Sequence, residues 1–245
     1  MRSPHMLRLT FHRLLLVLLC AGAAVTGACA QQKPFTARVE IVGRPGNAQA
    51  AGRSADASNV VVWLVPLDGV ATPVAGQSFK LIQHDKRFEP HILVVQTGSQ
   101  VQFPNQDPFF HNVFSLFDGK RFDLGLYEAG SSRTIRFDRP GVSFLFCNIH
   151  PEMSAAVIAV DTPYFGLSDR AGKVTIANVP DGRYRLHVWY ERSAPEDLKI
   201  LDRTVTVGGP THLMETIQLM DKAKFKLEHN NKYGQPYVPP AAASY

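Results

Sequence analysis

A thiolate, an imidazole and a thioether fall within seven residues of one another in this sequence. Cys147, His150 and Met153 supply them, and the apolar residues before Cys147 predict a strand that leads into the loop. Two histidines and one cysteine in a plane, with a weak axial methionine, form the ligand set of electron-transfer copper sites. A second histidine must therefore come from elsewhere in the chain.

His111 is the best candidate for that second histidine. It stands at the start of a predicted strand, after Phe109 and Phe110 and before Asn112. Zinc is the main competing metal, but a structural zinc site normally uses four cysteine or histidine ligands rather than a thioether. A nucleophilic pair of Cys147 and His150 is the competing enzyme interpretation, and it explains neither Met153 nor His111. Copper therefore fits the four residues best.

The first thirty residues have the pattern of a secretory signal peptide. Three arginines precede an apolar run at residues 14–25, and small residues follow at 27–30. The run is too short to span a bilayer, and no later segment is long and apolar enough to do so. We expect cleavage after Ala30 and a periplasmic or secreted protein, with lipidation of Cys29 as the alternative.

Loss of this leader changes both the cysteine content and the charge. Cys20 and Cys29 lie in the leader, so the mature chain keeps Cys147 alone. A single thiol in an oxidising compartment risks oxidation unless it is buried or binds a metal. Removing the three leader arginines also lowers the formal net charge from +5 to +2. The sequence contains no basic stripe, so it gives little support to nucleic-acid binding.

The sequence of the mature chain predicts an all-β fold. Short β-type runs alternate with turn signals such as Thr97-Gly98, Pro140-Gly141 and Asp181-Gly182, and no long run has a helical period. The predicted strands are residues 36–42, 60–65, 78–83, 92–96, 100–103, 111–115, 132–137, 143–147, 155–160, 173–177, 183–190, 199–207 and 212–219. Residues 221–245 are polar, and we expect them to form a flexible tail.

The spacing Cys-x-x-His-x-x-Met and the upstream His111-Asn112-Val113 resemble those of cupredoxins of the amicyanin and plastocyanin type. The resemblance implies a Greek-key β-sandwich over residues 77–161 that holds one copper ion. It implies that His111, Cys147 and His150 form the trigonal plane, with Met153 as the axial ligand. It also implies that Asn112, as a neighbour of the ligands, steadies the ligand loop and the thiolate.

The sequence around this stretch resembles a carboxypeptidase-regulatory-like, immunoglobulin-like β-sandwich. Residues 171–189 match the second half of such a module and the early strands match its first half. We predict that residues 36–70 and 163–220 form one seven-stranded sandwich into which the cupredoxin domain is inserted. The alternative is a tandem order in which the early strands extend the copper domain. Contacts between Trp63 and the strand at 183–190 would distinguish the two.

The leading functional hypothesis is one-electron transfer between periplasmic redox partners, without a small-molecule substrate and without enzymatic activity. A copper carrier or storage protein is the alternative, and a mononuclear copper enzyme is a third class, which would need the coordination position that Met153 fills. Among the other histidines, His91 is the one that could serve a second site, because it precedes a strand of the same domain.

Overall fold

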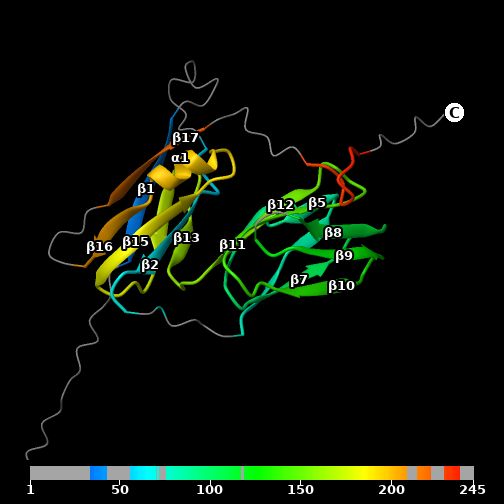
Figure 1. Ribbon diagram of the computed structural model, residues 1–245, viewed down its shortest axis with the longest axis horizontal. Coiled ribbons are helices and arrows are strands. Elements are labelled where there is room, and N and C mark those ends of the chain that lie inside the picture. Colours follow the sequence, from blue (N-terminus) through cyan, green and yellow to red (C-terminus); the bar gives the residue numbers. More distant parts are fainter. Residues whose placement is uncertain are drawn as a thin grey trace, which may run out of the picture. The chain divides into compact units, whose positions relative to one another are not determined.

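The computed structural model describes residues 34–42, 56–69, 71, 76–116, 119–208, 214–221 and 229–237. These residues belong to one compact unit, and they confirm the all-β prediction, with one short helix among the strands (Figure 1). The predicted signal peptide, residues 1–30, lies outside the described residues. No helix in the described part of the chain is long and apolar enough to cross a membrane.

The strands lie between the turns that Gly, Pro, Asn and Asp residues mark in the sequence. Their bounds are β1 Phe35–Val42, β2 Val61–Pro66, β3 Ser78–Lys80, β4 Ile82–His84, β5 Arg87–Glu89, β6 Ile92–Gln96, β7 Gln100–Pro104, β8 His111–Ser115, β9 Phe122–Tyr127, β10 Ser132–Arg136, β11 Gly141–Phe146, β12 Ser154–Val160, β13 Phe165–Leu167, β14 Lys173–Ile176, β15 Gly182–Trp189, β16 Arg203–Val207 and β17 Glu215–Met220. The helix α1 spans Pro195–Ile200, between β15 and β16.

The sheets that carry the predicted ligands lie in the middle of the chain. One sheet has the order β6-β12-β11-β8-β9, a second has the order β10-β7-β3, and β4 and β5 form a hairpin. Buried side chains from both sheets, among them Phe103 on β7 and Leu145 on β11, form one apolar cluster. We call these strands the first sandwich. Strands β8 and β11 are antiparallel neighbours with Phe114 opposite Phe146, so the start of β8 extends past the end of β11 and lies beside the loop that follows it.

Strands β6 and β12 are buried on both faces, which explains their nearly continuous apolar sequences. Successive side chains of a strand point to opposite faces. Val157 and Ala159 on β12 belong to the core of the first sandwich, whereas Ala156 and Ile158 belong to a second apolar cluster. That second cluster also contains residues of β1, β2, β14 and β15. The two groups of strands therefore share buried surface along β12.

The remaining strands form a second sandwich, made of the sheets β14-β1-β17 and β13-β2-β15-β16. Strand β1 pairs with β17 in parallel, and β2 pairs with β15 antiparallel. Trp63 lies opposite His187 in the register of β2 and β15, and their rings stack with centroids 5.1 Å apart. Strands before and after the first sandwich in sequence thus form common sheets.

The structure differs from the predicted strands in several places. The strand predicted at 199–207 is wrong in its first part, because Pro195–Ile200 is helical. Pro195 fits the first helical turn, where its missing N–H is not needed, and Glu196 and Asp197 favour the positive end of the helix dipole. Strands β5, β9 and β13 were not predicted, since two are only three residues long and β9 contains Gly125.

Candidate metal centre

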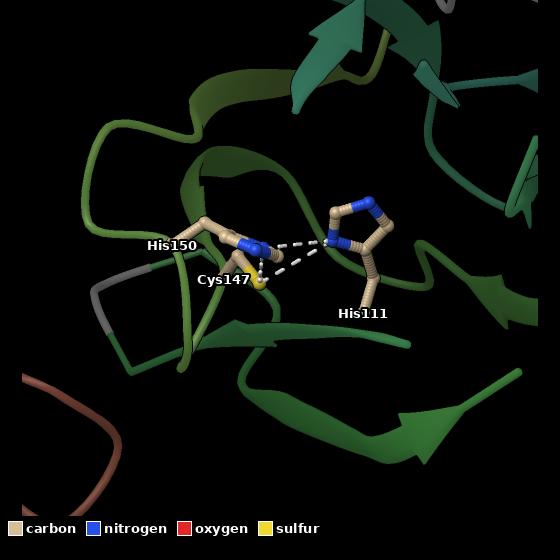
Figure 2. A group of neighbouring side chains, drawn as sticks. All are labelled: His111, Cys147 and His150. Atoms are coloured by element: carbon tan, nitrogen blue, oxygen red, sulfur yellow. Dashed lines mark hydrogen bonds between the residues drawn. The ribbon is translucent and has the colours of Figure 1, made fainter. Parts of the chain in front are cut away.

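Three of the four predicted ligands converge at one end of the first sandwich. His111 is the first residue of β8, Cys147 directly follows β11, and His150 lies in the loop that joins β11 to β12. Their side chains point toward one another (Figure 2), and one donor atom from each lies within 4.8 Å of the others. Chain segments far apart in sequence therefore meet at one small site.

The distances between these donor atoms fit a single ion. Cys147 Sγ lies 3.8 Å from His111 Nδ1 and 3.6 Å from His150 Nδ1, and the two nitrogens are 3.1 Å apart. Bonds of about 2.0–2.3 Å from one ion to nitrogen and sulfur ligands place those ligands about 3–4 Å apart. The residues present can thus hold one metal ion among them without rearrangement of the backbone.

Met153 lies in the same enclosed region. Its side chain is fully buried and belongs to the apolar cluster that contains Cys147. The backbone of this segment is also closed on itself, since the Met153 N–H donates to the His150 carbonyl at 3.0 Å and the Cys147 N–H donates to the Met153 carbonyl at 3.3 Å. We call residues 147–153 the ligand loop.

Asp107 fixes the orientation of the His111 ring. Its Oδ2 lies 2.7 Å from His111 Nε2, and both side chains are almost completely buried. A proton on Nε2 that is donated to this carboxylate leaves Nδ1 unprotonated, and Nδ1 faces Cys147 and His150. Carboxylate partners of this kind make a histidine a better metal ligand.

Asp107 is in turn held by the hairpin of β4 and β5. The N–H groups of Asp85 and Lys86 donate to its two oxygens at 2.7 and 3.0 Å. Burial opposes ionisation of Asp107, but the donors from Lys86, His111 and Asp85 outweigh it and lower the pKa of the carboxyl group. Asp85 and Lys86 both have positive φ, at 51° and 54°, which brings their N–H groups into the turn.

The thiol of Cys147 lies in a buried position that also contains hydrogen-bond donors. Burial raises the pKa of this thiol, while backbone N–H groups of Asn112, Ile149 and His150 act against that rise. Donors aimed at a sulfur stabilise its thiolate form, which is the form that binds metals. Burial also lowers the pKa of His150, with nearby His111 acting in the same direction, and this favours the neutral imidazole that a metal requires.

Phe109 covers the two imidazoles. Its ring centroid lies 5.2 Å from that of His111 and 5.6 Å from that of His150. His111, Cys147 and Met153 have no exposed surface, whereas His150 is intermediate in exposure. The one donor side chain at the surface is therefore that of His150, and the loop residues beside it include the exposed Ile149.

Asn112 follows His111 on β8, and its side chain and its backbone contact different parts of the structure. Its side-chain amide donates to Asp123 Oδ1 at 2.7 Å and to the Gly125 carbonyl at 2.9 Å, so the side chain ties β8 to β9 rather than to the ligand loop. The contact with the sulfur comes from its backbone N–H instead. His91 lies away from the centre, where Nε2 is 2.7 Å from Glu191 Oε2.

Sequence reasoning missed two features of the centre. The first is Asp107, whose position four residues before a candidate ligand was a usable signal. The second is the C-terminal segment: residues 229–237, within the stretch expected to be a flexible tail, contact the ligand loop. Its short polar sequence gave no periodic pattern from which such a contact could be predicted.

Comparison with known proteins gives partial structural likenesses. No family model and no curated protein matches the chain. A purple cupredoxin from Nitrosopumilus maritimus matches 33% of this chain and 98% of its own at 22% identity and a TM-score of 0.30. An amicyanin variant in its reduced state matches 34% of this chain and 82% of its own at 20% identity and a TM-score of 0.32.

A copper-containing nitrite reductase from Thermus scotoductus SA-01 matches 50% of this chain but only 28% of its own length, at 21% identity and a TM-score of 0.33. These values are too low to assign the chain to a family. The arrangement of sheets and donor atoms is observed in this chain itself and does not depend on these comparisons.

Proposed function

We propose that this protein binds one copper ion through His111, Cys147 and His150, with Met153 as a weak axial ligand, and transfers single electrons between redox partners in the periplasm. The observation that supports this most is the convergence of the two imidazoles and the thiol at 3.1–3.8 Å. Two histidines, one cysteine and a nearby methionine are the donors that copper electron-transfer sites use.

A bound copper ion would supply reversible one-electron chemistry, and contacts within the chain support two of its proposed ligands. Asp107 holds the Nε2 proton of His111, and backbone N–H groups donate to the sulfur of Cys147. Phe109 packs against both imidazole rings. Ligands that are held in place by their neighbours rearrange little, which favours fast electron exchange.

The burial of the donors favours electron transfer over copper delivery. A carrier must release its metal, whereas three of the four proposed ligands here are fully buried. His150 reaches the surface and gives a partner protein a short path to the centre. The second sandwich is proposed as the host into which residues 77–161 are inserted, since its sheets combine strands from both sides of that insertion.

Redox cycling in the presence of a chelator tests this proposal against the carrier alternative. The mature protein is loaded with one equivalent of copper, reduced with ascorbate and reoxidised with ferricyanide, with a Cu(I) chelator present throughout. We expect repeated cycles with full retention of copper. Transfer of the copper to the chelator on the first reduction would instead support a carrier, and the Cys147→Ser variant serves as the control for nonspecific copper.

A further inference from the structure

The C-terminal segment 229–237, here called the strap, lies against the outer side of the ligand loop. The Tyr237 hydroxyl donates to the Cys147 carbonyl at 3.0 Å, and the Lys232 N–H donates to Asn148 Oδ1 at 3.0 Å. The His229 ring stacks on Phe146 with centroids 3.8 Å apart. The two hydrogen bonds reach the ligand loop from residues that are 84 and 90 positions further along the chain.

The strap has a defined turn structure of its own. Asn231 Oδ1 accepts the N–H groups of Tyr233 and Gln235 at 3.0 and 3.1 Å, and the Gly234 N–H donates to the Asn231 carbonyl at 2.9 Å. Gly234 has φ of 77°, a conformation that glycine adopts without strain. The turn orders the residues that flank it, so that Tyr237 and His229 also meet, with Tyr237 Oη 3.2 Å from His229 Nδ1.

A second anchor joins the strap to the strand beside β8. Lys232 Nζ lies 2.8 Å from Asp123 Oδ2, and the other oxygen of Asp123 accepts from Asn112. Because Asn112 directly follows His111, this hydrogen bond connects the Lys232–Asp123 ion pair to the start of β8. The strap therefore contacts both chain segments that supply donor atoms: the ligand loop directly, and the start of β8 through Asp123.

We propose that the strap is a positioning element of the metal centre, which keeps the ligand loop closed so that the donors of Cys147 and His150 stay converged. The inference rests on the proposed copper site for its consequence but not for its structural part. Residues 148–152 of the loop are partly or fully exposed at the surface, and a loop of this kind opens locally unless it is held. Each contact with the strap adds to the cost of opening.

Hydrogen exchange on the metal-free protein tests the structural part. Tyr237→Phe removes the hydroxyl that bonds the Cys147 carbonyl and that also contacts His229 Nδ1 within the strap, and it keeps the ring. We expect the amides of Cys147 and Met153 to exchange about threefold to tenfold faster, the size of the net contribution of one hydrogen bond. The matched control is Tyr233→Phe on the same turn, at a residue that is 72% exposed. An unchanged exchange rate in Tyr237→Phe would overturn the inference.

Copper dissociation tests the consequence. With Cu(II) bound, Tyr237→Phe should lose copper to EDTA about threefold to tenfold faster than Tyr233→Phe, while the midpoint of global unfolding stays the same. Equal dissociation rates in the two variants would overturn the positioning role. If the wild type binds no copper, the proposed function fails, but the exchange experiment on the metal-free protein still decides whether the strap closes the loop.

Discussion

At the scale of single residues, the centre depends on groups beside the donors as much as on the donors. His111 has a fixed ring because Asp107 accepts from its Nε2, and Asp107 is fixed because the N–H groups of Asp85 and Lys86 donate to it. The thiol of Cys147 receives its own donors from the backbone. The donor atoms of His111 and Cys147 are thus oriented before a metal arrives, which lowers the cost of binding.

Replacement of Asp107 by asparagine tests this support. Asp107→Asn removes a buried negative charge beside a proposed ligand, so Cu(II) is stabilised less and the reduction potential should rise on the order of 50–100 mV. Copper affinity should fall about 10–100-fold. Voltammetry and a competition titration measure the two effects. Asp138→Asn, at an exposed carboxylate paired with Lys120, is the matched control and should leave both values unchanged.

Met153 should adjust the potential more than it holds the metal. Met153→Leu keeps a buried apolar side chain of similar volume, so the variant should retain both copper and colour. The loss of a soft axial contact should raise the potential. Voltammetry of the two proteins provides the measurement. Complete loss of copper would show that the thioether is a principal ligand. An unchanged potential would show that Met153 is only a core residue.

At the scale of elements, the loop between β11 and β12 is joined at its end to the second sandwich. His91, just before β6, lies 3.0 Å from the Ser154 carbonyl through Nδ1 and 2.7 Å from Glu191 through Nε2. The hydrogen bond that His91 donates to the Glu191 carboxylate raises the pKa of His91, against the effect of burial. This pair connects the starts of β6 and β12 with the residues that follow β15.

The raised pKa of His91 sets the sign of a pH dependence. The pair stabilises the fold fully below the unfolded pKa of about 6.5 and loses its effect as pH rises through the folded pKa. Glu191→Gln should therefore cost about 0.5 kcal/mol at pH ~5.5, a small value because both side chains are partly exposed, and almost nothing at pH ~8.5. Thermal unfolding at both pH values measures this, with Glu196→Gln as control. An equal cost at both values would contradict the assignment.

The elements that could be predicted from the sequence are those whose patterns reflect burial on a sheet. The apolar residues of β6, β8 and β12 were predicted as strands to within a residue of the observed bounds. The helix α1 was not, because six residues carry too little periodicity to outweigh the β-type residues after it. The ligand spacing in the loop was visible in sequence, whereas Asp107 and the strap depend on contacts between distant segments.

At the scale of the whole molecule, the two apolar clusters meet along β12. On β12, Val157 faces the cluster of the first sandwich and Ile158 faces the cluster that contains β2 and β15. Phe144 on β11 also contacts Trp189 on β15, with ring centroids 6.2 Å apart. We therefore expect cooperative unfolding of both sandwiches, even though one is proposed as an insertion into the other.

Truncation of a shared residue tests this cooperativity. Ile158→Ala should cost about 2–5 kcal/mol, the usual range for a fully buried isoleucine. Both tryptophans, Trp63 and Trp189, lie in the second sandwich, so their fluorescence reports on it, while the colour of bound copper reports on the first. The two probes should give one midpoint, and both should shift together. Two separate transitions would show that the sandwiches unfold independently.

The most direct test of the central proposal is the absorption and electron paramagnetic resonance spectrum of the protein from residue 31 onward with one equivalent of Cu(II). A thiolate of Cys147 bound in a plane with His111 and His150 predicts an intense visible charge-transfer band and a small copper hyperfine splitting. The band should be absent in Cys147→Ser. A colourless spectrum of ordinary tetragonal copper in the wild type, or a band that persists in Cys147→Ser, would contradict the proposed site.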